Sequence, residues 1–252
     1  MISVCIVNFN EEKKLRRSLE SITDFAKDIV VIDLGSTDNS KKVVEQFKGN
    51  FFTHQVVSYV ELVRNYAVEK TSGDWILVLD PDEQVSLELK NKLKEITEQD
   101  KYMAVNIPRK NIFFNKWIAH SNWWPDRHIR FFKKGKVKWS DKIHSYPKVD
   151  GEVYTLPAKE ELAIVHQGYE SISQFIDRQN RYSQIEANNL FDQGEKFSWF
   201  LFLWKPTREF LVRFIRHAGF LDGFHGFALT YLMIMYQVQV VIELWELGRQ
   251  EN

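Results

Sequence analysis

The sequence predicts an α/β protein, with a mostly parallel central sheet flanked by helices and a helical extension at its C-terminal end. Apolar runs alternate with helix-like segments over residues 1–100, as in repeated strand–helix units. The runs are apolar throughout, which is typical of parallel strands covered on both faces. Residues 197–252 contain an aromatic stretch and then a long uncharged run, which indicates helices.

Four apolar runs are expected to be strands of this sheet: 2–9, 28–34, 51–53 and 75–79. Helices are expected after Asn10, which suits an N-cap, and after Asp38. The spacing of apolar residues predicts two more helices, at 59–70 and 86–99. The first part of the chain is therefore expected to form a sheet with helices on both faces.

Polar residues follow three of the predicted strands, at 8–10, 33–38 and 80–83. In parallel sheets of this kind, ligands bind beyond the carboxyl ends of the strands. The three polar clusters are therefore expected to meet at one binding edge.

The pattern changes after residue 100, where four strand-like pieces alternate with loops: 103–108, 128–132, 137–139 and 161–165. They predict an antiparallel or mixed extension of the sheet. A capping box from Ser171 to Gln174 opens a helix that is expected to run to about Phe191.

The C-terminal segment allows two interpretations. Its aromatic stretch is followed by several basic residues, and residues 226–242 then carry no charge. This run is shorter than the roughly 20 apolar residues of a membrane span, and Gln237 and Gln239 interrupt it. A buried pair of core helices is one interpretation. The combination of Trp and Arg favours the other, an amphipathic hairpin lying on a membrane surface.

The amino-acid composition limits which partners and which cellular compartment are expected. The chain of 252 residues has 34 Lys and Arg and 34 Asp and Glu, so its neutral balance argues against nucleic acid as a partner. Cys5 is the single cysteine, which fits a reducing compartment. The first residues have the pattern of a strand and not of a signal peptide, which predicts a cytoplasmic protein. The sequence leaves the oligomeric state unknown.

Asp80 and Asp82 stand two residues apart at the end of a predicted buried strand, and Glu83 follows them. Carboxylates in this arrangement can bind a divalent cation such as Mg²⁺, which prefers oxygen ligands and shares them with substrate phosphates. The alternative is a solvated turn, since Pro81 and Asp are common in turns. The position at the shared edge favours the cation.

Two more residues near this edge are candidates for ligand binding. Asp33 closes a strand and can accept a hydrogen bond from a base or a ribose hydroxyl, whereas Asp38 is expected to cap the next helix. Arg64 can pair with a nucleotide phosphate or base, because a guanidinium matches phosphate bidentately. The alternative for Arg64 is a solvated helix face.

A second group of candidates lies in the middle of the chain. Asp126 follows the aromatic pair Trp123-Trp124, and it can act as a general base for an acceptor hydroxyl. Arg130 can neutralise a leaving diphosphate. The alternatives are a turn aspartate and a surface arginine. His144 can complete a metal site or contact a phosphate, although a loop histidine often has no special role.

These motifs together resemble the GT-A glycosyltransferases of family 2, in particular the bacterial lipopolysaccharide-core type. The resemblance covers nearly the whole chain in order. It is carried by these stretches: SVCIVNFNEE, VVIDLGSTDNS, RNYAVEKTSGDWILVLDPDE, WWPDRHIRFFKKGKVKW, KIHS and GFLDGFHGFALTYLMIMYQVQVVIELWE.

The resemblance implies a Rossmann-like GT-A fold, a nucleotide-diphospho-sugar donor, usually a UDP-sugar, and inversion at the anomeric carbon. It implies Mg²⁺ or Mn²⁺ as the metal and a saccharide or lipid-linked acceptor. The implied roles are Asp126 as catalytic base with Arg130 beside it, and Asp82 as metal ligand. His144 is expected from its chemistry as a second metal ligand. The implied nucleotide-sugar contacts are Val7, Asn8, Phe9, Asp33, Arg64, Asp80 and Asp82.

We therefore expect a nucleotide-sugar-binding half at 1–100, an acceptor-binding and catalytic half at 101–196, and an amphipathic tail at 197–252. The expected protein is a metal-dependent hexosyltransferase of lipopolysaccharide-core-like synthesis. It would be peripheral on the inner face of the cytoplasmic membrane, which its C-terminal helices contact.

The chain departs from the family pattern at two positions. Ser145 stands where the family usually has Glu, and Leu34 replaces a small polar residue. The first departure keeps open a non-catalytic sugar-nucleotide-binding or membrane-scaffold protein with a degenerate fold. A phosphatase of the haloacid-dehalogenase type is disfavoured, since Glu83-Gln84 replaces the small pair that normally follows its second Asp.

Overall fold

The computed structural model describes residues 1–57, 60–139 and 146–250, and these fall into two compact units. Unit 1 consists of Met1–Arg109 and Arg127–His166, and unit 2 consists of Lys110–Asp126 and Gln167–Asn252. These boundaries differ from the expected divisions near residues 100 and 196. The donor and acceptor roles of the expected segments stay predictions.

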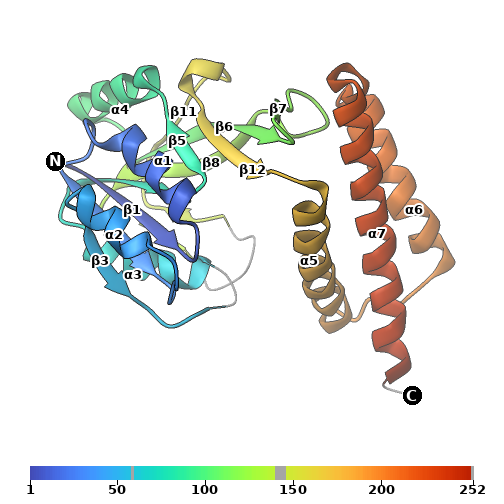
Figure 1. The fold of residues 1–252 in the computed structure, drawn as a ribbon. Coiled ribbons are helices and arrows are strands. Elements are labelled where there is room, and N and C mark those ends of the chain that lie inside the picture. The colour runs from blue at the N-terminus through green and yellow to red at the C-terminus, as the bar shows by residue number, and fades with distance from the viewer. Residues whose placement is uncertain (58–59, 140–145, 251–252) are drawn as a thin grey trace. The chain divides into compact units, whose positions relative to one another are not determined.

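The parallel part of the sheet in unit 1 forms as expected (Figure 1). β1 pairs in parallel with β2 on one side and with β4 on the other, and β2 pairs in parallel with β3. The bounds of these strands are β1 (Ile2–Asn8), β2 (Asp28–Asp33), β3 (Asn50–Thr53) and β4 (Trp75–Leu79). The carboxyl ends of the three longest strands therefore lie at one edge of the sheet.

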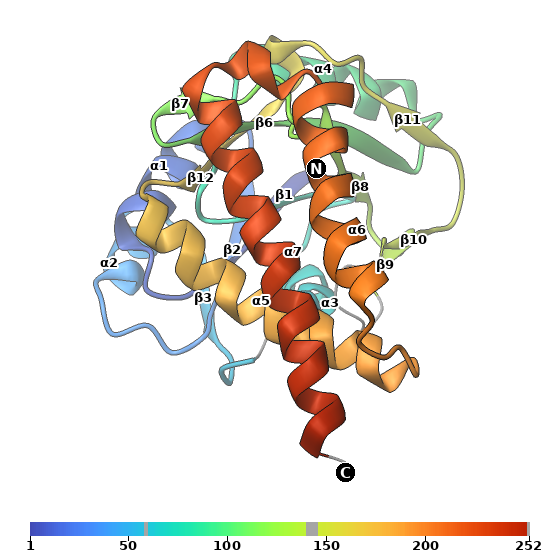
Figure 2. The same ribbon diagram turned by 90° about the vertical axis from the view of Figure 1, so that its right-hand side faces the viewer.

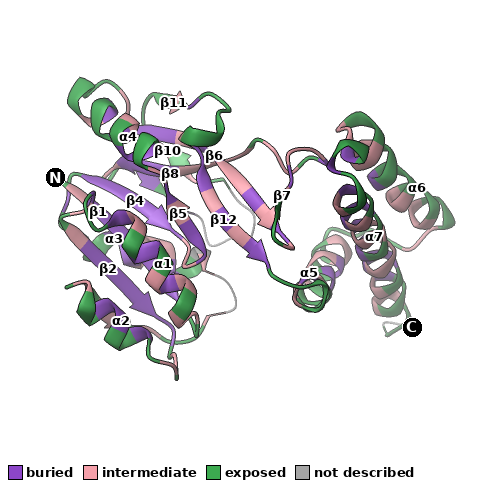
Figure 3. Cartoon of the chain, turned by 45° about the horizontal axis from the view of Figure 1, so that its top comes forward, coloured by how far each residue is buried: buried purple, intermediate pink, exposed green. Residues whose placement is uncertain are grey.

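Helices cover both faces of these strands, and alternate residues of β1 enter two different core clusters. Val4 and Ile6 pack with the apolar sides of α1, α2 and α4, whereas Cys5 and Val7 pack with α3. The helices are α1 (Glu12–Ile22), α2 (Ser40–Gln46), α3 (Glu61–Lys70) and α4 (Leu87–Gln99). Burial on both faces explains why the strands are apolar throughout (Figure 3).

The rest of the sheet is mixed, as predicted. β8 (Asp126–Lys133) runs antiparallel to β4, and β5 (Glu83–Val85) runs antiparallel to β12 (Ile164–Tyr169). The complete order is β3-β2-β1-β4-β8-β6-β12-β5, with β6 at Ala104–Phe113. Two short strands, β7 (Lys116–Trp117) and β11 (Val153–Thr155), pair with β6, whereas β9 (Val137–Lys138) and β10 (Lys148–Val149) form a separate two-stranded sheet.

The strand predicted at 161–165 is wrong in its first part. A 3-10 turn occupies Glu160–Leu162, where the Leu162 amide donates to the Lys159 carbonyl, and the strand begins only at Ile164. Asn10 is also not an N-cap: its φ is +53°, and its Oδ1 accepts from the Thr37 amide at 2.8 Å.

Asp38 has the structural role predicted for it, at two helix starts instead of one. Its carboxylate accepts from the Glu12 amide of α1 at 2.9 Å and from the Ser40 amide of α2 at 3.0 Å. Burial raises the pKa of Asp38, but these bonds and that of the Ser40 hydroxyl hold it below its ordinary value.

In unit 2, α7 (Phe224–Gln250) packs between α5 (Ile172–Asp192) and α6 (Trp199–Phe210), as Figure 2 shows. A π-helical turn (Leu211–Arg216) and a 3-10 turn (Gly219–Asp222) join α6 to α7. One face of α7 enters a core cluster of unit 2. The core-helix interpretation is therefore correct for that face, while the opposite face of α7 is exposed.

Candidate functional site

The acidic turn after β4 is ordered by its own last residue. The Glu83 side chain is completely buried, and its Oε2 accepts from the Asp80 amide at 2.9 Å. Its Oε1 accepts from Nη2 of Arg130 at 2.8 Å. Glu83, whose role the sequence defined least, therefore holds the turn in shape and orients Arg130.

Asp80 lies between two arginines. Its Oδ2 accepts from Arg130 Nη2 at 2.5 Å, and its Oδ1 accepts from Arg64 Nη2 at 3.3 Å. Burial raises the pKa of Asp80, but the charges of Arg130 and Arg64 outweigh it and hold the pKa well below its ordinary value. The carboxylate is therefore ionised at every physiological pH.

The alternatives of a solvated Arg64 and a surface Arg130 are wrong. The Arg64 side chain is 14% exposed and the Arg130 side chain only 3%. Two groups of Arg130, Nε and Nη1, are buried with no hydrogen-bond partner among the described residues. A buried guanidinium with unused donors is costly unless a partner arrives, and a ligand anion is such a partner.

Asp82 is nine-tenths buried, and its Oδ2 lies 3.5 Å from Nε2 of His166 in β12. Burial raises the pKa of Asp82, but the neighbouring imidazole of His166 outweighs it and keeps the pKa below its ordinary value. His166 was missed from the sequence, because the predicted strand ended at residue 165 and no local motif marks it.

Asp82 and His166 fit a divalent metal. A carboxylate oxygen and an imidazole nitrogen at this separation can ligate one ion, and a carboxylate is a ligand type that suits Mg²⁺ and Mn²⁺. Among the residues described, no three His, Cys, Asp or Glu side chains gather into a complete metal site. An ion here would therefore share its shell with substrate oxygens, as Mg²⁺ and Mn²⁺ commonly do.

The ends of β1 and β2 form a closed polar turn. Asn8 Nδ2 donates to Asp33 Oδ1 at 3.0 Å, and the other Asp33 oxygen accepts from the Gly35 and Ser36 amides at 3.1 and 2.7 Å. The Asp33 carboxylate thus accepts several hydrogen bonds from its own turn. Val7 is buried, while Phe9 is 47% exposed at the same edge.

Asp126 belongs to unit 2, where it is half-buried. Its Oδ2 accepts from Nδ2 of Asn111 at 3.1 Å, and Asn111 is fully buried and also bonded to the Trp123 carbonyl. Asn111 is a second residue that the sequence did not reveal. It fixes the orientation of the Asp126 carboxylate.

The tryptophans before Asp126 pack within unit 2. Trp123 stands edge-on to Phe113 with ring centroids 4.9 Å apart, and Trp124 stands edge-on to Trp117 at 5.5 Å. The predicted metal ligand His144 and the departure Ser145 lie outside the described residues, so the structure does not bear on either.

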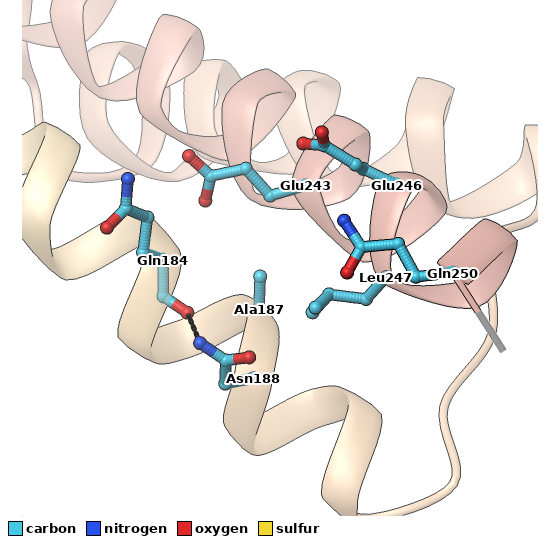
Figure 4. A pocket seen from close by; sticks show the side chains of 7 residues that line it. All are labelled: Gln184, Ala187, Asn188, Glu243, Glu246, Leu247 and Gln250. Carbon is cyan, nitrogen blue, oxygen red and sulfur yellow. Dashed lines mark hydrogen bonds between the residues drawn. The ribbon is translucent and has the colours of Figure 1, made fainter.

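A hollow of about 250 Å³ lies between α5 and α7 (Figure 4). It is lined by Gln184, Ala187, Asn188, Glu243, Glu246, Leu247 and Gln250. Carboxamides and acids dominate its wall, and none of the predicted site residues contributes to it. The candidate site at the strand ends is therefore a different place.

Comparison with known sequences agrees with the fold. The family model described as Glycosyl transferase family 2 matches residues 3–148, more than half of the chain. The lipopolysaccharide core biosynthesis glycosyltransferase LpsC of Rhizobium meliloti is 24% identical over 90% of this chain and 85% of its own length. An uncharacterized glycosyltransferase of Rickettsia typhi is 27% identical over 90% of this chain and 80% of its own.

A solved structure has the same fold. The mannosyltransferase PcManGT of Pyrobaculum calidifontis, in complex with GDP-Man and Mn²⁺, superposes with a TM-score of 0.54 and 13% identity. The match covers 96% of this chain and 86% of that one. The predicted GT-A fold is confirmed.

Proposed function

The chain belongs to glycosyl transferase family 2, and we propose that it is an inverting, metal-dependent enzyme that uses a nucleotide-diphosphate sugar, a UDP-sugar. The proposed acceptor is a saccharide or lipid-linked glycan of a lipopolysaccharide-core-like pathway, which the similarity to LpsC supports. The observation that carries the proposal is the acidic turn after β4, in which Asp82 pairs with His166 of β12 and Asp80 pairs with Arg130 of β8. These residues provide ligands for a cation and a cationic partner for a diphosphate.

Asp82 and His166 would hold Mn²⁺ or Mg²⁺, which supplies charge stabilisation to the departing nucleoside diphosphate. The unused Nε and Nη1 of Arg130 support a direct role in binding the same diphosphate. Asp80 orients both Arg64 and Arg130. Asp80 and Arg64 are proposed to line the nucleotide side of the site, together with Val7, Asn8, Phe9 and Asp33.

Asp126 is the proposed general base. Its carboxylate takes the proton from an acceptor hydroxyl while that oxygen attacks the anomeric carbon from the face opposite the diphosphate. The bond between the anomeric carbon and the diphosphate oxygen breaks with its electrons on the leaving group, which inverts the configuration. Asn111 supports this role, since its bond to Oδ2 holds the Asp126 carboxylate in a fixed orientation.

The proposed location is the cytoplasmic face of a membrane. Among the described residues one helix, Phe224–Gln250, is long and apolar enough to cross a membrane by length and composition. The exposed apolar side chains of that helix and of α6 support contact with a membrane surface.

The function is tested with Asp126→Asn. We expect donor turnover to fall roughly 10²- to 10⁴-fold, the usual contribution of a general base, while UDP binding measured by calorimetry stays the same. Asp177→Asn, an exposed acid of α5, is the matched control and should keep wild-type turnover.

Two results would contradict the proposal. Full activity of Asp126→Asn would remove Asp126 from the chemistry. UDP-sugar binding without turnover by the wild-type protein, across a panel of saccharide and lipid-linked acceptors, would favour the non-catalytic binding protein instead.

A further inference from the structure

The C-terminal helices of unit 2 expose an unusual number of large apolar side chains. We define the aromatic–basic face as the exposed large apolar side chains of residues 199–242 together with Arg208 and Arg216. Its most exposed apolar members are Phe224 at 78%, Trp199 and Phe200 at 72%, Leu203 at 65% and Leu221 at 61%. Soluble surfaces rarely gather this much contiguous apolar area without a partner.

The exposed residues follow helical spacing, so they form continuous stripes. On α6, Phe200, Trp204 and Arg208 are separated by four residues each, and the first two rings stack at 6.2 Å. On α7, Phe224, Phe227, Tyr231, Met235 and Ile242 repeat every three, four or seven residues and are all exposed. Figure 2 shows α6 and α7 running side by side.

In this region the acidic side chains are buried, whereas the exposed charged side chains are basic. Between residues 197 and 242 the acids are Glu209 and Asp222, and both are buried. Glu209 is bonded to Arg213, and Asp222 accepts from the Ala119 and His120 amides at 3.2 and 3.0 Å. The exposed charges of the same stretch are the basic ones, Arg208 and Arg216.

Over residues 197–242 the apolar surface therefore carries exposed basic groups and no exposed acid, and exposed acids such as Glu195 and Glu246 lie outside this range. Such a surface is complementary to a bilayer that contains anionic lipid. A hydrophobic protein partner would not require the acidic side chains to be buried. We propose that the aromatic–basic face docks on the surface of an anionic lipid bilayer. This inference deepens the proposed function by naming the chemistry of the membrane on which the acceptor is met.

The face lies on the membrane instead of crossing it. The face of α7 opposite the stripe packs on α5, which carries Asp177, Arg178, Arg181 and Glu186. A spanning α7 would draw these charges toward hydrocarbon, at a cost of about 2.5–3.5 kcal/mol for a central Asp or Arg. Docking through the exposed stripe leaves α5 in water.

The same segment holds the loop that precedes the proposed base. Arg213 Nη1 donates to the Ser121 carbonyl at 2.9 Å, and the Ser121 amide donates to the His217 carbonyl at 3.0 Å. The Arg213 guanidinium also lies 4.9 Å over the Trp123 ring. A bilayer bound at residues 208–221 is thus linked through this loop to Asp126, which suits an acceptor anchored in lipid.

The test is sedimentation of the full chain with vesicles. We expect binding to phosphatidylcholine vesicles that contain phosphatidylglycerol, weak binding to pure phosphatidylcholine, and release by high salt. Arg208→Gln with Arg216→Gln should weaken partition about 25-fold, at about fivefold per arginine. Trp199→Ser with Phe200→Ser should weaken it roughly tenfold or more. Lys41→Gln with Lys42→Gln and Leu87→Ser, at exposed sites of unit 1, are the matched controls.

Three outcomes would overturn the inference. No binding to anionic vesicles rejects the docking, resistance to carbonate extraction shows a spanning α7, and a dimer that Trp199→Ser with Phe200→Ser dissociates assigns the face to a second copy. Donor hydrolysis measured without vesicles tests the proposed transferase function independently of membrane docking. It should be unchanged in the arginine variant, and its absence in the wild type would count against the transferase only.

Discussion

At the scale of single residues, Arg130 is the side chain on which the charged cluster depends. It is 3% exposed and bonds both Asp80 and the completely buried Glu83. Replacing one member of a buried ionic group leaves the others without compensation, which costs about 3–5 kcal/mol. We expect Arg130→Met to lower the free energy of unfolding in urea by that amount.

Lys136→Met is the matched control for this measurement, because Lys136 pairs with Asp150 on an exposed surface. Surface pairs contribute little, so its unfolding midpoint should stay near the wild-type value. Equal stability of Arg130→Met and wild type would mean that the acids are solvated, contrary to the structure.

The residues of the candidate site were predictable to the extent that they follow a strand in the chain. Asp80 and Asp82 directly follow a recognisable apolar strand, so their place at the binding edge could be inferred. His166 and Asn111 carry no such signal, because each acquires its partner from a segment distant in sequence or across a hairpin. The fixed pairing of Arg130 with Asp80 is likewise set by the antiparallel packing of β8 on β4.

At the scale of elements, the long buried strands were predictable, since they are apolar on both faces. The short strands were not, because two- and three-residue strands such as β5 and β11 exist only through their neighbours. Asn10 had the right residue type for a cap, but the helix start is held by Asp38 from another turn. A side chain that bonds to a residue of another element cannot be predicted from the local sequence pattern.

Asp28 makes such a connection at the amino end of β2. Its carboxylate accepts from Ser3 of β1 at 2.7 Å, from Asn50 of β3 at 3.2 Å, and from the amide and hydroxyl of Ser72 before β4. Burial raises the pKa of Asp28, but the bonds from Ser3 and Ser72 outweigh it, so the folded-state pKa lies below the ordinary value.

A lowered carboxyl pKa gives stability that is complete above the unfolded-state value and is lost as pH falls through the folded-state value. Asp28→Asn should therefore unfold at lower urea concentration than wild type at neutral pH. The gap should close in acid, below the ordinary carboxyl pKa of about 3.9. Glu88→Gln, an exposed acid of α4, should track wild type at both ends. A gap that is independent of pH would assign the effect of Asp28 to packing.

At the scale of the whole molecule, the fold class and the family were available from sequence, whereas the division into units was not. Residues 110–126 belong with the C-terminal helices through contacts such as those of Asp222 and Arg213, which no linear pattern announces. The loop before Asp126 and the aromatic–basic face thus belong to one compact unit. The residues proposed to bind the nucleotide and the metal belong to the other.

Asp82 and His166, the proposed metal ligands, predict how metal and nucleotide affect the thermal stability of the whole chain. A ligand that binds only the folded protein stabilises it by about 2.7 kcal/mol at a hundred times its dissociation constant. Because Asp82 and His166 are too few to complete a metal shell, Mn²⁺ alone should raise the unfolding temperature little, and UDP with Mn²⁺ should raise it more than the separate effects combined. Asp82→Asn should abolish this extra increment and keep that of UDP alone, while Glu88→Gln keeps both. A large shift with Mn²⁺ alone would show that the protein completes the metal site without the nucleotide.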